Sequence, residues 1–163
     1  MNMFDATEIA VWFIYKSNAE MKEHSNSEEM FEGISDLKLQ KLLYYAQGIC
    51  LSMTGKKLFP NKIYAWDHGP VIKEVYEIYK KYGSEYIPNI SDEKNDKIVN
   101  KIENNNDVSK ILNIVYDNFA IYTAWQLRNM THEIDSPWYK TPRNKEIDTK
   151  LIKRYFDEVV MEN

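Results

Sequence analysis

The sequence predicts an all-α protein built around one central helix, and three observations support this prediction. Apolar residues recur at helical spacing through most of the 163 residues. Helix-capping patterns precede several of these segments, and polar joints separate them. Apolar residues alternate with others near Ile63–Trp66, where we expect at most a minor extended segment.

The chain length favours one compact multi-helix domain over residues 1–163. A chain of this size can bury roughly two-thirds of the surface that its unfolded form exposes. The sequence contains no internal repeat and no proline- and glycine-rich linker that would divide it. Its hydrophobic fraction of 44% and charged fraction of 28% are typical of a globular protein and argue against disorder.

The first predicted helix covers about Thr7–Lys22. Asp5 and Glu8 precede and open it with the spacing of a capping box, in which aspartate replaces serine or threonine. The next stretch, Glu23–Asp36, is acidic and contains no lysine or arginine. We expect it to be a solvated loop, and an acidic partner-binding segment is the less favoured alternative.

The central helix is predicted over about Leu37–Thr54. Gly55 follows it, where a left-handed C-cap residue belongs. Lys38, Lys41 and Gln47 lie off the apolar stripe of this helix, so burial on one face is expected. The stripe consists of Leu39, Leu42, Leu43, Ala46, Ile49, Cys50 and Met53.

A third helix is predicted to open at Gly69 and Pro70 and to continue through Tyr82. Proline suits the first helical position, and Gly83 would end the helix. His68 would then lie at a helix N-terminus, whose partial positive charge lowers a histidine pKa. Its neutral ring is expected to tether the turn, with a role as base or hydrogen-bond acceptor as the alternative.

Three further segments complete the predicted helices. They cover about Asp92–Glu103, a stretch that Asp107 caps and that ends near Ile121, and Lys145–Val160. Between the last two, Thr123 and Gln126 form another capping-box pattern, which predicts a shorter helix after them.

Charge and composition exclude several function classes. The net charge is −4 and neither half of the chain is basic, so a nucleic-acid-binding regulator is only a third alternative. The five glycines are not clustered, so no phosphate-cradling loop is expected. The N-terminus lacks a signal-peptide pattern, and no apolar stretch approaches the roughly 20 residues that cross a bilayer. We therefore expect a cytoplasmic protein without a membrane partner.

The histidines leave a catalytic alternative open. A metal-dependent or histidine-using hydrolase centred on His68 and His132 is the second reading, although the sequence lacks H-E-x-x-H and C-x-x-C motifs. Ser136 lies near His132 but not in a G-x-S-x-G elbow, and before Pro137 it is better suited to cap a short turn. The one cysteine, Cys50, is expected to be a small buried hydrophobe.

Three blocks of sequence, in order along the chain, carry a more specific signal. They are Leu37–Gly48, then Ala65–Val71 with Val75, Tyr76 and Tyr79–Gly83, and finally Thr131–Glu133 with Ser136–Trp138. Together these blocks closely resemble the SocA-like Panacea antitoxin-domain family, which includes phage-associated proteins of the GepA type. The resemblance extends over about Asp5 to Phe156, nearly the whole chain.

The resemblance implies a protein-binding antitoxin and not an enzyme. Its partner would be a protein toxin, encoded by an adjacent gene, and an AAA+ protease would join it if the protein acts as a proteolytic adaptor. The resemblance implies no catalytic residue, cofactor or metal ligand. Twelve positions match the family and are candidates for partner binding, and we call them the motif residues: Lys38, Gln40, Lys41, Tyr44, Trp66, His68, Gly69, Pro70, Thr131, His132, Pro137 and Trp138.

The motif residues also suggest where a partner would bind. We expect the Trp66–Pro70 turn and the Thr131–Trp138 turn to lie together near one end of the central helix. Their rings would form an aromatic-lined groove for a segment of the partner. The alternative is that these rings and histidines only fasten the two turns to the core.

Overall fold

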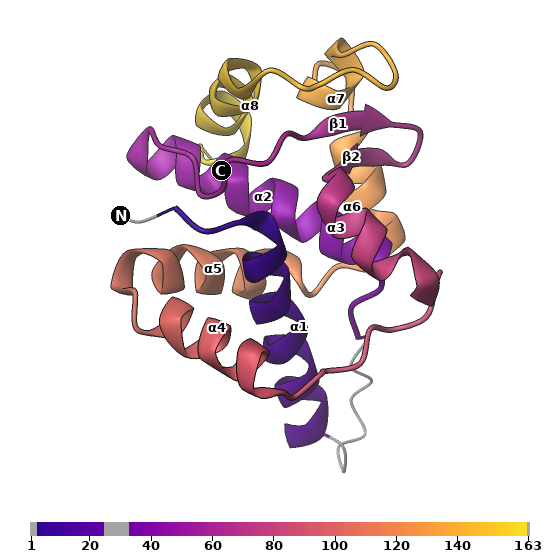
Figure 1. Ribbon diagram of the computed structural model, residues 1–163. Helices are drawn as coiled ribbons and strands as arrows, with labels where there is room; N and C mark the ends of the chain where they lie inside the picture. The colour runs from indigo at the N-terminus through magenta and orange to yellow at the C-terminus, as the bar shows by residue number, and fades with distance from the viewer. Residues whose placement is uncertain (1–2, 25–32, 163) are drawn as a thin grey trace.

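The computed structural model describes residues 3–24 and 33–162, which are mostly helical, as predicted (Figure 1). Most of the acidic loop expected over Glu23–Asp36 lies outside the described residues. Within them, two short strands form one hairpin, β1 (Tyr64–Trp66) and β2 (Gly69–Val71). The α-helices are α1 (Ala6–Glu23), α2 (Asp36–Thr54), α3 (Lys73–Tyr79), α4 (Glu93–Glu103), α5 (Asn106–Phe119), α6 (Ala124–Thr131), α7 (Pro137–Lys140) and α8 (Thr149–Tyr155).

Two short helices of other types extend this set. A 3-10 turn, Lys80–Tyr82, continues α3, and a π-helical turn, Phe156–Val160, continues α8. In the part of the chain that the structure describes, no helix is long and apolar enough to cross a membrane.

Local capping sets several helix boundaries as the sequence predicts. The Asp5 backbone N–H donates to Glu8 at 3.0 Å, and this completes a capping box at α1. Thr123 and Gln126 exchange the corresponding pair of hydrogen bonds, at 2.8 and 3.1 Å, before α6. Gly55 ends α2 with φ of 73°, the left-handed conformation that glycine adopts at low cost. The cap of α5 differs from the prediction, because Asn105 and not Asp107 forms it.

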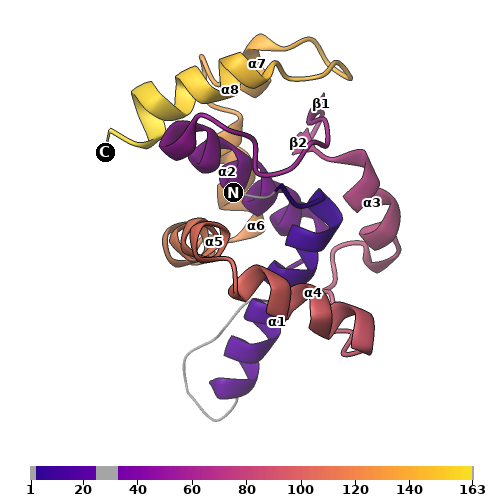
Figure 2. The same cartoon turned by 60° about the vertical axis from the view of Figure 1, so that its left-hand side comes forward.

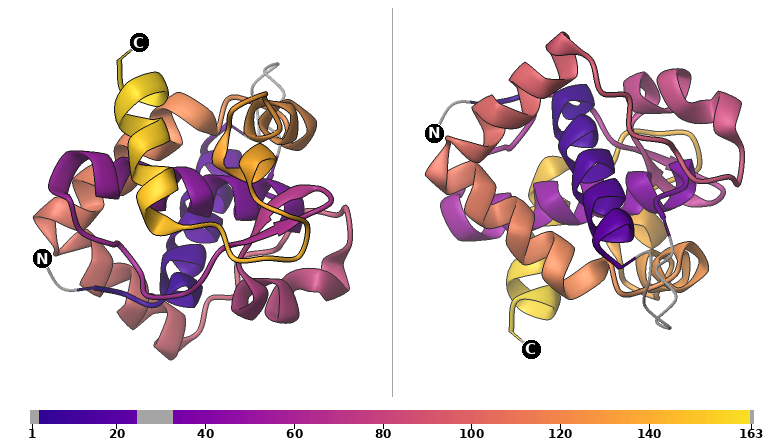
Figure 3. Two further views of the ribbon diagram at one scale, coloured as in Figure 1. Left: turned by 90° about the horizontal axis from the view of Figure 1, so that it is seen from above. Right: turned by 90° about the horizontal axis from the view of Figure 1, so that it is seen from below.

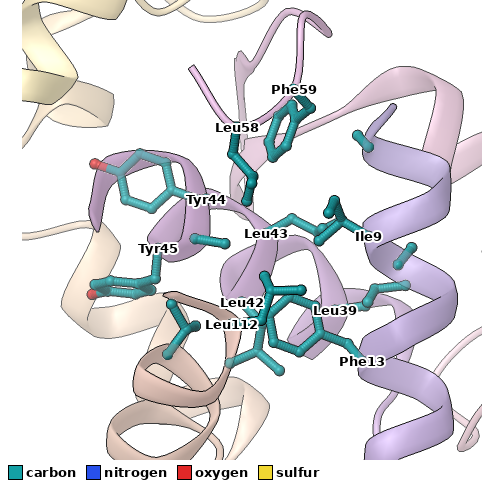
Figure 4. Packing of buried hydrophobic residues seen from close by; sticks show 14 of the residues in the cluster. Ile9, Phe13, Leu39, Leu42, Leu43, Tyr44, Tyr45, Leu58, Phe59 and Leu112 are labelled. Carbon is teal, nitrogen blue, oxygen red and sulfur yellow. The ribbon is translucent and has the colours of Figure 1, made fainter. Parts of the chain in front are cut away.

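Helix α2 lies at the centre of the molecule, with α4 and α5 on one side and α7 and α8 on the other (Figures 1 and 2). It contacts α1, α3, α5, α6, α8 and β2. Figure 4 shows apolar side chains of α2 between those of α1 and α5. This central cluster includes Ile9, Phe13, Leu39, Leu42, Leu43 and Leu112.

The prediction that α2 is buried on one face was wrong, because every residue from Lys38 to Leu51 is buried. Neighbouring elements cover the polar side as well as the apolar stripe. Gln47 shows how this is tolerated: its side chain accepts the Leu58 N–H at 2.7 Å and donates to the Phe59 carbonyl at 2.8 Å. A buried polar group that is hydrogen-bonded in this way avoids most of its desolvation cost.

The prediction that Gly69 and Pro70 open a helix was also wrong. They belong to β2, where Pro70 lies opposite Ala65 and Gly69 lies opposite Trp66 in antiparallel register. Gly69 has φ of 115°, outside the helical region, and α3 begins only after its N-cap, Ile72. The minor extended segment expected near Ile63–Trp66 is confirmed as β1, and Gly83 ends the continuation of α3 as predicted.

The last helix begins later than predicted, because residues 145–147 lie along the outer edge of β1. The Ala65 N–H donates to the Lys145 carbonyl at 2.9 Å, and the Ile147 N–H donates to the Ile63 carbonyl at 2.8 Å. Asp148 then caps α8. This segment satisfies the backbone groups that an edge strand would otherwise expose.

Cys50 belongs to the buried apolar cluster and lies near the C-terminal end of α2. Its side chain is fully buried on α2, which confirms the prediction of a small buried hydrophobe. Burial raises the pKa of the thiol above its usual value, so the neutral form dominates near neutral pH.

Candidate functional site

The Trp66–Pro70 turn and the Thr131–Trp138 turn lie against each other, as expected from the sequence (Figure 3). The indole N–H of Trp138 donates to the Trp66 carbonyl at 2.6 Å, across 72 residues of sequence. The His132 Nε2 lies 3.0 Å from the Asp67 carbonyl oxygen, across 65 residues. Two side chains of the second turn therefore contact backbone carbonyls of the hairpin.

The Trp138 ring contacts a histidine ring and a guanidinium. The His132 ring lies 3.7 Å from its ring centroid, and the Arg143 guanidinium lies 3.6 Å from it. Arg143 also donates to the carbonyls of Trp138 at 2.5 Å and Thr141 at 2.6 Å. A guanidinium that donates to several carbonyls orders the loop around it. Arg143 is not one of the motif residues, and this role was not predicted from the sequence.

The two ring nitrogens of His132 both face backbone carbonyls. Nδ1 lies 2.6 Å from the Arg128 carbonyl oxygen, and Nε2 faces Asp67 as described. Burial lowers the pKa of His132, while these two carbonyls favour the protonated ring. Because carbonyl oxygens only accept, the neutral ring donates to one of the two and only the protonated ring donates to both. In either form the ring lies between α6 and the hairpin.

His68 has a different environment from the one predicted. It lies exposed in the hairpin turn before β2, and the chain does not begin a helix there, because α3 begins at Lys73. Among the residues that the structure describes, no group of three histidine, cysteine, aspartate or glutamate side chains is placed to hold a metal ion. The structure therefore does not join His68 and His132 into such a cluster.

Polar motif residues of α2 hold the backbone of neighbouring segments. The Gln40 amide accepts the Ile72 N–H at 2.8 Å and donates to the Ile72 carbonyl at 3.3 Å, as a paired strand would. The Lys38 ammonium donates to the Ala120 carbonyl at 2.7 Å, at the end of α5. These contacts position the start of α3 and the link between α5 and α6 relative to α2.

Lys41 is the most buried polar motif residue, with 0% of its surface exposed. Its ammonium donates to the Pro70 carbonyl at 3.2 Å. Burial lowers the pKa of Lys41 to about 7, and the nearby Asp36 carboxylate partly opposes that shift. A Cβ on Gly69 would lie 2.8 Å from Lys41 Cε and 3.0 Å from Thr131 Oγ1. Only glycine leaves room for the lysine and the threonine at this crossing.

Two motif residues serve the core and the turn instead of the surface. The Tyr44 ring is buried and lies edge-on to Tyr45 and Phe156, at 5.5 and 5.4 Å between centroids. Pro137 occupies the first turn of α7 behind Ser136, which caps the helix as predicted. Tyr44 therefore serves the core and the Lys38 ammonium contacts the end of α5, whereas the other motif residues lie at or beside the two turns.

A surface groove of about 620 Å³ adjoins the hairpin turn. Residues at the start of α2 and in the hairpin, α3 and α6 line it. Among its lining residues, Gln40, Trp66 and His68 are motif residues, whereas Asp36, Tyr76 and Trp125 were not predicted as site residues. Trp125 is 57% exposed. Its position off the apolar stripe of its helix was the sequence signal that could have identified it.

Comparison with known proteins identifies the class of protein. Residues 39–139, which include both turns, match the family described as antitoxin SocA-like, Panacea domain. The chain belongs to this family, and the resemblance inferred from its sequence blocks is confirmed. Membership supports an antitoxin-type role, favours a non-enzymatic function and implies a toxin partner.

A relative within this class is antitoxin SocA of Caulobacter vibrioides (strain NA1000 / CB15N). It is 30% identical over 131 residues, which cover 78% of this chain and 70% of that protein. No solved structure matches the chain.

Proposed function

We propose that this protein neutralises a partner toxin by binding it at the two joined turns and the groove beside them. The groove carries the proposal, because it combines an exposed tryptophan, Trp125, with the half-buried rings of Trp66 and Tyr76. Tryptophan and tyrosine side chains contribute much of the binding energy at protein interfaces. A concave surface lined by such rings suits a protruding segment of a partner.

The motif residues divide into two roles under this proposal. The buried ones, such as Lys41 and Thr131, hold the turns in place, whereas Trp66 and His68 face the partner from the groove. The contacts of His132 and Trp138 with the hairpin carbonyls favour a surface that is already ordered before binding. Such a surface loses less conformational entropy when the partner docks.

Co-expression with the product of the adjacent gene tests the proposal. Growth rescue together with co-purification of the two proteins is the expected result. Absence of both would contradict toxin neutralisation by this chain.

Alanine variants then locate the surface. Trp66→Ala removes a groove ring but keeps the carbonyl that Trp138 contacts. We expect it to fold, by circular dichroism, and to bind the toxin at least tenfold more weakly, as a ring at an interface hot spot does. Tyr139→Ala is the matched control, because Tyr139 is 54% exposed and does not line the groove. Loss of folding in Trp66→Ala would show that the ring only fastens the turn, and full binding would exclude the groove.

The way in which the toxin is neutralised is a separate part of the proposal. We propose that the bound toxin is delivered to an AAA+ protease, as the family resemblance implies. The half-life of the toxin in cells with and without the protease tests this step. Rescue that needs the protease, with loss of the toxin, supports delivery. A stable complex and rescue without the protease would instead establish sequestration.

A further inference from the structure

The groove contains a buried carboxylate, one of whose two oxygens has no hydrogen-bond partner. Asp36 lines the groove in the first turn of α2, and its side chain is only 8% exposed. Its Oδ1 atom is buried without a hydrogen-bond partner, and the ion pairs among the described residues do not include it. Lys41, the nearby cation, donates to the Pro70 carbonyl instead. Gln40 hydrogen-bonds to this carboxylate and the charge of Lys41 attracts it, so the carboxylate is compensated in part. A buried charge with an unsatisfied oxygen favours a further partner.

The charges around the groove favour a cation as that partner. Asp67 is a second, exposed carboxylate among the lining residues. Lys80 also lines the groove, but its ammonium lies 2.7 Å from a carboxylate oxygen of Glu77 and is already paired. Among the residues that line the groove, the two charges outside that ion pair, Asp36 and Asp67, are therefore both negative.

The aromatic walls favour a cation carried on an organic side chain. Trp66 and Tyr76 meet edge-on at 5.1 Å, and the Trp125 ring lies on the α6 side of the groove. Arg128, which does not line the groove, already lies 4.4 Å from the Trp125 ring centroid. Faces of such rings attract ammonium and guanidinium groups, and the aliphatic stem of the same side chain covers their apolar surface.

We propose that the groove binds an arginine or lysine side chain from an extended segment of the toxin. The cationic head pairs with the Asp36 carboxylate, and the stem lies across Trp66 and Trp125. That the side chain belongs to a toxin rests on the proposed function above, whereas the specificity for a basic side chain rests on the groove itself.

Short peptides test the specificity without the toxin. The probe is acetyl-Gly-Arg-Gly-amide, and its control contains citrulline, which has nearly the same shape but no charge. Binding is followed by NMR through the indole N–H signals of Trp66 and Trp125. We expect the arginine peptide to shift both signals in a saturable way and the citrulline peptide to bind about tenfold more weakly or not at all.

Two substitutions complete this test. Asp36→Asn keeps the side-chain shape and should weaken the arginine peptide about tenfold, whereas Asp117→Asn removes an exposed carboxylate on α5 and should have no effect. Equal binding of both peptides, or full binding to Asp36→Asn, would overturn the proposal. If Asp36→Asn does not fold, Trp125→Ala with Tyr139→Ala as control gives the same decision.

Co-expression separates this inference from the proposed function. If the wild type rescues growth and Asp36→Asn rescues it equally, the inference fails and the antitoxin function stands. If the wild type does not rescue but binds the arginine peptide through Asp36, the function fails and the specificity stands. A wild-type dimer that Asp36→Asn dissociates would assign the groove to a second copy of the chain and overturn the proposal.

Discussion

Lys41 lies where α2, β2 and α6 meet, and its burial has an energetic cost. The unfolded chain leaves this ammonium in water, whereas the folded chain gives it the Pro70 carbonyl and the nearby Asp36 charge. Its pKa of about 7, against 10.5 for an exposed lysine, reflects that incomplete compensation. A lysine in this position makes the stability of the fold depend on pH.

The Lys41→Met variant measures this dependence. Between the folded pKa of about 7 and the unfolded value of 10.5, the unfolded chain binds more protons than the folded chain. The free energy of unfolding should therefore rise with pH from about 7 to 9.5 in the wild type. Below pH 7 the destabilisation caused by burying the Lys41 ammonium is fully present. Lys41→Met should remove the rise and unfold with a free energy about 1–3 kcal/mol higher at pH 7. Urea titrations at several pH values measure both effects.

Lys94→Met is the control for this experiment, because Lys94 is exposed on α4. It should keep the wild-type rise of stability with pH. If Lys41→Met also keeps that rise, the buried ammonium is not its source.

Asp36 should have the opposite pH dependence. Burial raises its pKa from 3.8 to about 6, so between these values the folded chain binds more protons than the unfolded chain. The free energy of unfolding contributed by this residue should fall as pH rises from 4 to 6, and the loss is complete above pH 6. Asp36→Asn should remove that fall and stabilise the protein by about 1–2 kcal/mol at pH 7. Urea unfolding at pH 4, 5, 6 and 7, beside Asp117→Asn, measures it; a destabilised Asp36→Asn would show that the carboxylate supports the fold.

At the scale of helices and strands, local signals predicted where many elements begin and end. The capping boxes at Asp5 and Thr123, the cap at Gly55 and the strand near Trp66 depend on neighbouring residues and were correct. The pairing of β2 and of residues 145–147 with β1 depends on contacts between distant segments. A Gly-Pro pair suits a helix start or a strand equally, and only the partner strand decides.

The site was predictable to a similar extent. The meeting of the two turns followed from sequence blocks, but the contributions of Arg143 and Asp36 did not. Arg143 acts by donating to backbone carbonyls, which every residue carries, so no residue pattern marks its targets. Asp36 resembled a loop residue because its burial comes from segments that are far away in sequence.

The crossing of α2 with the end of α8 provides a test at the level of elements. A Cβ on Gly48 would lie closer than 3.0 Å to the buried ring of Phe156. Gly48→Ala should therefore destabilise the protein by about 1–2 kcal/mol, although the same change in an open helix stabilises it by about 1 kcal/mol. In the Phe156→Leu background the clash is smaller, so adding Gly48→Ala should become neutral or stabilising. Thermal unfolding of the four proteins measures this change of sign, and a stabilising Gly48→Ala in the wild type would contradict the close crossing.

For the whole molecule, the position of α2 predicts cooperative unfolding. This helix contacts α1, α3, α5, α6 and α8, so none of these can separate without exposing part of its surface. We propose that the chain behaves as one domain and unfolds in one transition. Far-ultraviolet circular dichroism should lose its signal at the same urea concentration at which the intrinsic fluorescence of the four tryptophans changes. Separate midpoints would indicate two independently folding parts.

The single thiol of Cys50 can serve as a chemical probe of how the native protein opens. Iodoacetamide reacts with thiolates in water, and this thiol is buried on the helix that all of these elements surround. Its alkylation rate therefore reports how often the core opens around the C-terminal end of α2, without any introduced label or fluorophore. A docked toxin that stabilises the native state should lower this alkylation rate, and a protease that unfolds the complex should raise it.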